Sequence, residues 1–203
     1  FVMITNLHPL TMYAYKEGFA YFCQNQYSEP KNDNMECYIF NNKKKLNDDN
    51  ESVRCSSSIY NKINEKNDKC FLKIEKILVL AILSIYKDLI EIVKEICHEN
   101  DEEFKETKQY SPYQRFFHLI GIDILIDKNG FPFIIGINDN PSMTALNNYD
   151  ETIKSNLIKD EIELINSCLY KQKINDVKWK KILPSFHRSL QVVENELMNE
   201  IKY

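Results

Sequence analysis

The sequence has no closely spaced cysteine pair, no long apolar run and no excess of positive charge. Without a C-x-x-C pair, the scattered cysteines predict reduced thiols rather than a zinc site. The densest apolar run, 77–85, is far shorter than the roughly 20 residues of a membrane-spanning helix, and no signal peptide is recognisable. A net charge of -4 argues against nucleic acid as a partner, although a local basic patch could still bind an acidic polypeptide. The cysteines stand at positions 23, 37, 55, 70, 97 and 168.

What the sequence does have is enough periodic apolar sequence for one domain, interrupted by a polar segment. The chain opens with Phe1 inside an apolar run, which predicts a fragment that begins within a fold. Residues 29–68 are rich in Asn, Lys, Asp, Glu and Ser and lack apolar periodicity, so we predict a low-complexity, solvated insert. Residues 1–28 and 69–203 would then form the domain.

The apolar patterns predict an α/β fold in which an antiparallel sheet is packed by long helices. Residues 71–99 carry apolar side chains at steps of three and four, as in a core helix. A second helix is predicted from an N-cap at Asp150 to about Tyr170, and a third from Pro184 towards Ile201. The second helix would bury Ile153, Leu157, Ile158, Ile162 and Ile165. Strands are expected at 1–5, 12–15 and 19–23, and Trp179 is expected at the edge of the core.

The stretch 116–142 contains the strongest local signal, a β-hairpin around Asn129-Gly130. If these two residues form the loop, Lys128 pairs with Phe131. Counting back along both strands then places Asp123 opposite Gly136, and Gly121 opposite Asn138. Because side chains alternate with period two, Asp123, Gly136 and Asn138 would share one face, which a three-residue loop would not allow.

An acid and an amide therefore converge on an otherwise apolar hairpin, where an unpaired carboxylate would be costly. One interpretation is a Mg²⁺ site, because Mg²⁺ takes carboxylate and amide oxygens and completes its shell with water and nucleotide phosphates. The other is that Asp123 lies near a sheet end and only forms a hydrogen bond with a neighbouring group. The residues alone leave both interpretations open.

Several motifs of this chain resemble the tubulin–tyrosine ligase-like family, which are ATP-grasp amino-acid ligases. The hairpin matches at Gly121 to Asp127 and at Pro132 to Asn138, and the turn after it matches at Pro141-Ser142. The Tyr-x-Tyr-Lys-Glu-Gly stretch within residues 1–28 also matches. The second predicted helix matches at Asp150, Ile153, Lys154, Leu157, Ile158, Asp160, Ile162 and Leu164.

The resemblance implies the C-terminal part of an ATP-grasp-like domain that uses Mg²⁺ and ATP. Such ligases phosphorylate a protein carboxylate, above all on tubulin tails, and the amine of free glutamate, glycine or tyrosine then attacks the acyl phosphate. It also implies a cytoplasmic location on the microtubule cytoskeleton. In the family an Asp, a Glu and an Asn bind magnesium, and by motif position Asp123 and Asn138 carry over as metal and nucleotide ligands.

The chain departs from the family pattern at three places. Gly136 stands where the family has its metal-binding Glu, and Tyr21 stands where it usually has an arginine of the substrate site. The stretch nearest to the family's H-L-T-N motif is 37–40, which does not match it. The family's nucleotide-binding lysine and its K-F-D-x-R motif would lie before Phe1.

Two hypotheses follow from these matches and departures. The first is an ATP-dependent ligase with a reduced metal set, which uses another acid such as Asp139 or Glu36. The second is a pseudoenzyme that keeps the fold and binds tubulin or another partner.

Overall fold

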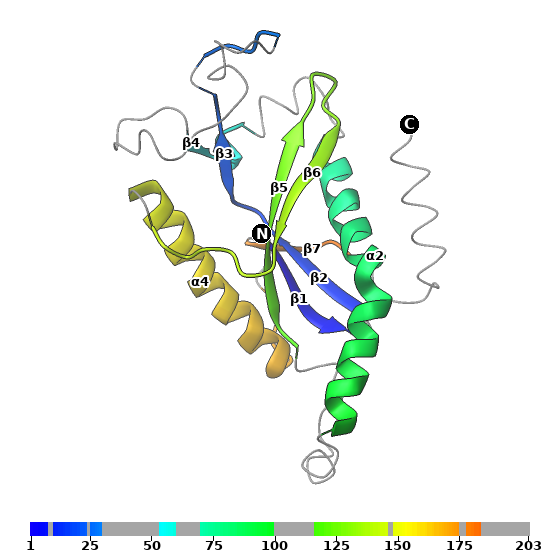
Figure 1. Cartoon of the computed structure of the whole chain (residues 1–203). Coiled ribbons are helices and arrows are strands. Elements are labelled where there is room, and N and C mark those ends of the chain that lie inside the picture. Colours follow the sequence, from blue (N-terminus) through cyan, green and yellow to red (C-terminus); the bar gives the residue numbers. More distant parts are fainter. Residues whose placement is uncertain are drawn as a thin grey trace.

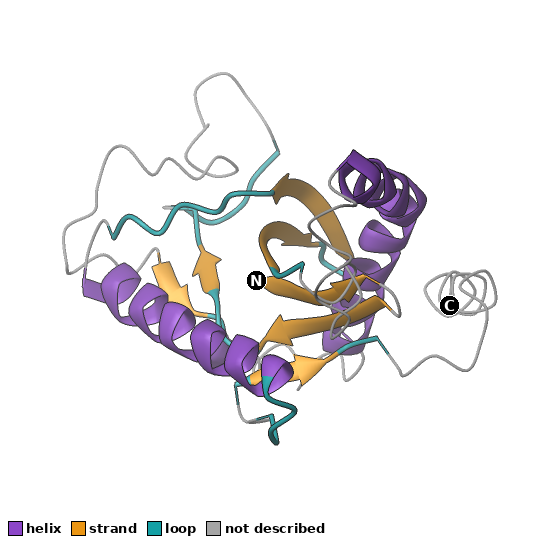
Figure 2. Cartoon of the chain, turned by 90° about the horizontal axis from the view of Figure 1, so that it is seen from below, coloured by secondary structure: helices purple, strands orange, loops and turns teal. Residues whose placement is uncertain are grey.

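The computed structural model describes residues 1–7, 10–23, 25–29, 53–59, 70–99, 116–145, 148–174 and 178–183. These residues form three layers, in which a five-stranded sheet lies between helix α2 (Cys70–Glu99) and helix α4 (Asn148–Leu169) (Figure 1). Seen along the sheet, the two helices cover opposite faces (Figure 2). The prediction of an α/β fold with long helices packed on an antiparallel sheet is confirmed.

The sheet is antiparallel at every pairing between its neighbouring strands. Its strand order places β1 in the centre and the hairpin at one edge. In spatial order the strands are β6 (Pro132–Asn138), β5 (His118–Ile126), β1 (Val2–Leu7), β2 (Leu10–Tyr15) and β7 (Trp179–Lys181). The first two strands of the chain, β1 and β2, extend beyond their predicted bounds because each pairs on two sides.

Both faces of the central strand β1 are buried, which explains its nearly continuous apolar run. Val2 and Ile4 pack in a core with α2, whereas Met3 packs in a second core with Leu157 of α4. The α2 core also contains Leu78, Val79, Ile82, Tyr86, Val93 and Ile120. Trp179, which was expected at the edge of the core, is fully buried within the second core, although its strand β7 is at an edge of the sheet.

Helix α4 begins two residues earlier than predicted and buries a different face. Asp150 is an acid inside the first turn rather than the N-cap, because the helix starts at Asn148. Ile158 and Ile162 are exposed, so their predicted burial is wrong. The periodic pattern admitted two neighbouring faces, and packing against the sheet selected the one with two acids. The buried residues are Asp150, Ile153, Leu157, Asp160 and Leu164.

A second, two-stranded sheet pairs β3 (Phe19–Tyr21) with β4 (Val53–Cys55), and a helical turn follows at 57–59. Residues 53–59 therefore form regular structure inside the predicted insert, because β4 finds a partner in β3. Most of the remaining insert lies outside the described residues, as does the predicted helix from Pro184. Among the described cysteines none forms a disulfide, and no described helix is long and apolar enough to cross a membrane.

Candidate functional site

The hairpin places the predicted site residues on one face. Asp123 pairs with Gly136 and Gly121 pairs with Asn138, as predicted. The Asn138 side chain donates a hydrogen bond from Nδ2 to Asp123 Oδ2 at 3.2 Å, so these two side chains meet across the strands. The opposite face of β5 carries Ile120 and Ile122, which pack towards α2. The acid and the amide therefore lie on the α4 side of the sheet, where Asp123 is exposed.

The hairpin loop has three residues rather than the two predicted. Asp127 N donates to Phe131 O at 2.9 Å, which closes the loop, and Gly130 adopts a positive φ of 71°. Asp127 Oδ1 also accepts hydrogen bonds from Phe131 N at 2.7 Å and from Asn129 N at 2.8 Å. These bonds lower the pKa of Asp127 below its ordinary value. An Asx turn thus selects the longer loop.

A β-bulge restores the register that the three-residue loop would otherwise shift. Near the loop Ile124 pairs with Ile134, but beyond the bulge Asp123 pairs with Gly136. Ile135 is the extra residue, and it is exposed. A one-residue slip would turn Asn138 to the other face of the sheet. The predicted pairing is therefore right, but the predicted loop, with Lys128 opposite Phe131, is wrong.

Gly121 allows the chain after the hairpin to lie directly on β5. A Cβ atom at this position would lie 3.0 Å from Pro141 Cβ, which is too close for a rigid proline ring. Asn138 is opposite Gly121, so the same close approach fixes the turn that follows the candidate ligand. The Gly-x-Asp motif at 121–123 and the Asn-x-x-Pro motif at 138–141 are thus in contact.

One residue of β3, Tyr21, and two residues of α4, Asp150 and Lys154, lie on the α4 side of the sheet, as the acid and the amide do. Burial, and then the charges of Asp150 and Asp123, raise the pKa of Tyr21 to about 12, so its phenol is neutral. Lys154 lies 3.6 Å from Asp150 and donates to Thr144 O at 2.7 Å. Its ammonium is thereby fixed on the loop after the hairpin.

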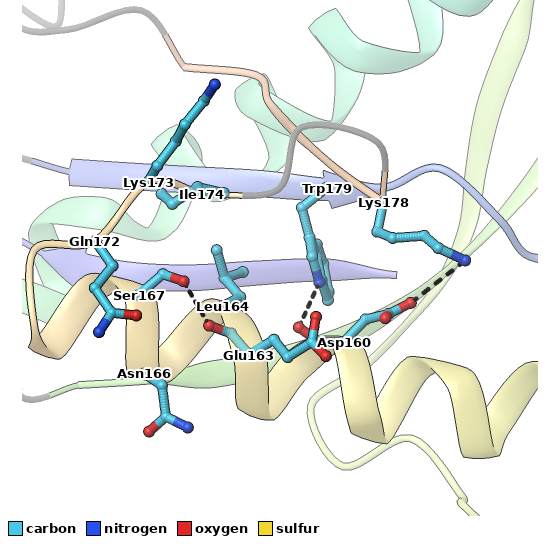
Figure 3. A pocket seen from close by; sticks show the side chains of 10 residues that line it. All are labelled: Asp160, Glu163, Leu164, Asn166, Ser167, Gln172, Lys173, Ile174, Lys178 and Trp179. Carbon is cyan, nitrogen blue, oxygen red and sulfur yellow. Dashed lines mark hydrogen bonds and ion pairs between the residues drawn. The ribbon is translucent and has the colours of Figure 1, made fainter.

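Asp160 is the second motif acid, and its surroundings are structural. Tyr15 donates from its hydroxyl to Asp160 Oδ2 at 2.6 Å, and Lys178 Nζ lies 3.8 Å from the same oxygen. Trp179 donates from Nε1 to Asp160 O at 3.0 Å (Figure 3). These contacts join β2, α4 and β7 beside a pocket of about 290 Å³. The sequence indicated Asp160 only as a motif match, because the predicted apolar face of this helix did not include it.

Asp139, one of the predicted substitute ligands, does not join Asp123. It lines a different pocket of about 420 Å³ together with His118, Pro141 and Glu161. Glu36, the other predicted substitute, lies outside the described residues, as does the stretch 37–40. Within the described part of the chain, no three His, Cys, Asp or Glu side chains gather as a metal-binding group.

The side chains that are present fit a weakly held Mg²⁺. Asp123 supplies one carboxylate, and one or two carboxylates plus phosphate oxygens are usual for this ion. Asn138 donates from its nitrogen in this structure, so binding a metal requires its amide to turn over and present the oxygen. Gly136 adds nothing, but a Cβ there would lie 3.0 Å from Asp123 Oδ2, so a longer acid at this position would reach the same point.

Comparisons with known proteins agree with the motif evidence. A model of the tubulin-tyrosine ligase family matches residues 1–176. A probable beta-tubulin polyglutamylase of Tetrahymena thermophila is 25% identical over 225 residues, which cover 100% of this chain and 18% of that protein. The probable alpha-tubulin polyglutamylase Ttll1 of the same organism is 26% identical over 179 residues, covering 81% of this chain and 38% of that protein. The tubulin polyglutamylase ttll6 of Danio rerio is 24% identical over 196 residues, 90% of this chain and 24% of its own length. The chain thus spans well under half of these relatives.

Proposed function

The chain belongs to the tubulin-tyrosine ligase family, and from that premise we propose that it takes part in the ATP-dependent ligation of glutamate to a carboxylate of tubulin. The choice of glutamate and tubulin rests on relatives that are named tubulin polyglutamylases. A location on the microtubule cytoskeleton is part of the same proposal. The observation that carries it is the meeting of Asp123 and Asn138 on one face of the hairpin.

In this proposal Asp123 and the turned amide of Asn138 hold Mg²⁺. The ion would supply positive charge to the phosphates of ATP during phosphoryl transfer. Lys154 fixes the loop that follows Asn138 through its bond to Thr144 O, so it helps to orient that ligand. Tyr21 is neutral and can offer a hydroxyl but no charge to a substrate. In this proposal the described residues thus orient the metal ligands and the substrate more than they supply charge to them.

A second candidate function is a tubulin-binding module without catalysis. It is favoured by Gly136, because a glycine opposite Asp123 leaves this cross-strand pair with one carboxylate. A missing charged metal ligand commonly lowers metal affinity or activity by about 10–100-fold or more. The neutral Tyr21 also favours it, since a phenol cannot form the ion pair with an anionic substrate group that an arginine would form.

The experiment that tests the proposal compares the full chain with Asp123→Asn and Asp139→Asn. Isothermal titration calorimetry would measure Mg·ATP binding, and radiolabelled glutamate would measure incorporation into tubulin. We expect binding and incorporation in the parent, their loss in Asp123→Asn, and little change in Asp139→Asn, which lines another pocket.

Other outcomes separate the two candidates. Co-sedimentation with microtubules, in the absence of both ATP binding and incorporation, supports the binding module and contradicts the ligase. If Asp139→Asn abolishes incorporation as fully as Asp123→Asn, Asp139 is a substitute ligand and a metal site made of Asp123 and Asn138 alone is wrong.

A further inference from the structure

The β3–β4 sheet is separate from the five-stranded sheet and lies near the N-terminal end of α4 (Figure 1). We call residues 19–21 and 53–55 the ribbon. Its apolar burial is small, because Val53 is buried whereas Phe19 and Cys55 are only partly buried and Tyr21 is 47% exposed. A two-stranded sheet of this size is marginally stable by itself. Polar contacts must therefore contribute much of what holds the ribbon in place.

One carboxylate, that of Glu17, makes three of these polar contacts. Glu17 Oε1 accepts hydrogen bonds from Ser56 Oγ at 2.8 Å, from Ser57 N at 3.0 Å and from Gly18 N at 3.0 Å. Ser56 N in turn donates to Gly18 O at 2.9 Å. Burial raises the pKa of Glu17, but these bonds outweigh it and hold the pKa below its ordinary value. The carboxylate thus joins the start of β3 to the end of β4, across almost 40 residues of sequence.

The ribbon carries the aromatic side chains that flank the candidate site. Tyr21 lies within reach of the charges of Asp123 and Asp150. The ring of Phe19 lies 5.8 Å from Lys154 Nζ and 6.4 Å from the ring of Phe1. A shift of the ribbon would therefore move the Phe19 ring away from Lys154 and change the surroundings of the Tyr21 phenol.

We propose that Glu17 is a positioning residue, whose carboxylate fixes the ribbon against α4, with Phe19 beside Lys154 and Tyr21 on the same side of the sheet as Asp123 and Asn138. The two hydrogen bonds to Ser56 and Ser57, which cross about 40 residues of sequence, carry this inference. It deepens the proposed function, since Asp123 and Asn138 are the residues proposed to bind Mg²⁺, but the position of Tyr21 can be measured without turnover. Failure of the ligase proposal would leave the inference intact.

The competing explanation is purely local. Ser57 N belongs to the first turn of the helical segment 57–59, so Glu17 could act only as a cap from outside that turn. A cap would stabilise this turn and leave Tyr21 where it is. The two explanations differ in one observable, the coupling between Tyr21 and Asp123.

The test places 3-fluorotyrosine at position 21 of the full chain and records its ¹⁹F spectrum. In the parent, Asp123→Asn removes a nearby charge, so we expect it to shift the ¹⁹F resonance and lower the phenol pKa. In Glu17→Ala the ribbon is no longer fixed, so the same Asp123→Asn change should leave the resonance almost unmoved. Glu17→Gln keeps one acceptor oxygen and should give an intermediate response.

Ser58→Ala is the matched control, because Ser58 lies in the same turn and donates to Cys55 O rather than to Glu17. It should preserve the full response of Tyr21 to Asp123→Asn. Amide hydrogen exchange checks that the variants are folded: Glu17→Ala should speed exchange at Ser56 at least about tenfold and leave the β1 and β2 amides unchanged. If Tyr21 responds to Asp123→Asn equally with and without the Glu17 carboxylate, the inference is overturned and only the cap remains.

Discussion

Asp160 and Asp123 are two motif carboxylates of one domain with opposite surroundings. Asp160 is buried, accepts a 2.6 Å hydrogen bond from Tyr15 and lies 3.8 Å from the Lys178 ammonium. Asp123 is exposed and accepts a 3.2 Å hydrogen bond from the neutral amide of Asn138. The first carboxylate joins three elements, whereas the second leaves much of its hydrogen-bonding capacity to solvent.

The difference shows that the motif residues of this chain divide into two kinds. Tyr15, Glu17 and Asp160 bind other parts of the protein, so their side chains are explained by the fold alone. Asp123 contributes little to the fold that a serine or asparagine could not supply. Under the proposed function, the exposed acid beside an amide would be explained by a ligand. Removing each carboxylate should therefore have very different effects on stability.

The largest effect is expected for Asp160→Ala. The change leaves the Tyr15 hydroxyl buried without its acceptor and removes the partner of Lys178. We expect a loss of about 3 kcal/mol in the free energy of unfolding, measured by urea denaturation. Glu163→Ala, one turn further along α4 at an exposed position, is the control and should change little. A loss below about 1 kcal/mol for Asp160→Ala would contradict its structural role.

The next effect is that of Tyr15→Phe, which we expect to cost about 1.5–2 kcal/mol near neutral pH, because a hydrogen bond to a charged group is lost. Burial, and then the bond to Asp160, raise the pKa of Tyr15 above its ordinary value of 10.0. The stabilisation is therefore present below pH 10 and is lost as the pH rises further, because the unfolded tyrosine ionises first.

The measurement is urea denaturation of parent and variant between about pH 7 and 11, a range that brackets the ordinary tyrosine pKa. The difference between them should shrink above about pH 10, whereas Tyr170→Phe, at a 71% exposed position, should show no difference at any pH. A constant difference across the range would mean that the Tyr15 hydroxyl does not titrate with folding.

A smaller effect that depends on metal is expected for Gly136→Glu. Its backbone φ is not in the left-handed region, so a side chain is allowed, but the new Cβ crowds Asp123 Oδ2 at 3.0 Å. Without Mg²⁺ the second carboxylate should cost about 1 kcal/mol, as like charges across strands do. Added Mg·ATP should then restore or raise the stability of this variant, as measured by thermal unfolding. Gly136→Gln has the same size without the charge, and an equal response of both variants to Mg·ATP would exclude metal binding at this position.

The smallest effect on stability is expected for Asp123→Asn. Its side chain is exposed and an asparagine can still pair with Asn138, so the free energy of unfolding should change by less than about 0.5 kcal/mol. Urea denaturation measures this value beside that of Asp160→Ala. If the two losses are similar, Asp123 is a structural acid and the contrast between the two carboxylates does not hold.

The sequence predicted the elements of the fold better than their partners. The apolar periodicity of α2 and the Asn-Gly turn indicated a core helix and a hairpin, because both signals are local. The buried face of α4 was missed, since it includes two acids whose burial depends on partners that the periodic pattern does not reveal. Asp150 is paired with Lys154 one turn along the helix, and Asp160 is paired with Tyr15 of a distant strand. The pairing of β4 with β3 was missed because it too joins distant segments.

The candidate site was predicted only in part. Strand alternation predicted that one face carries Asp123, Gly136 and Asn138. The three-residue loop and the bulge at Ile135 each shift the predicted pairing by one residue, and the two shifts compensate for each other. The role of Glu17 could not be read from the sequence, because its partners Ser56 and Ser57 lie beyond a polar segment with no periodicity.

The loop and the bulge of the hairpin together decide whether Asp123 and Asn138 share one face of the sheet. Twelve residues separate Asp123 from Gly136. Three of them form the turn and one more, Ile135, is bulged, and because these two odd numbers compensate for each other, the acid and the amide lie on one face. One extra residue in the turn can be compensated by one bulged residue in a strand. Asp123 and Asn138 can therefore keep the same pairing while the hairpin loop changes length. Relatives with different spacings between this aspartate and this asparagine can therefore share one geometry, provided that their lengths differ by even numbers of residues or that a bulge compensates for an odd one.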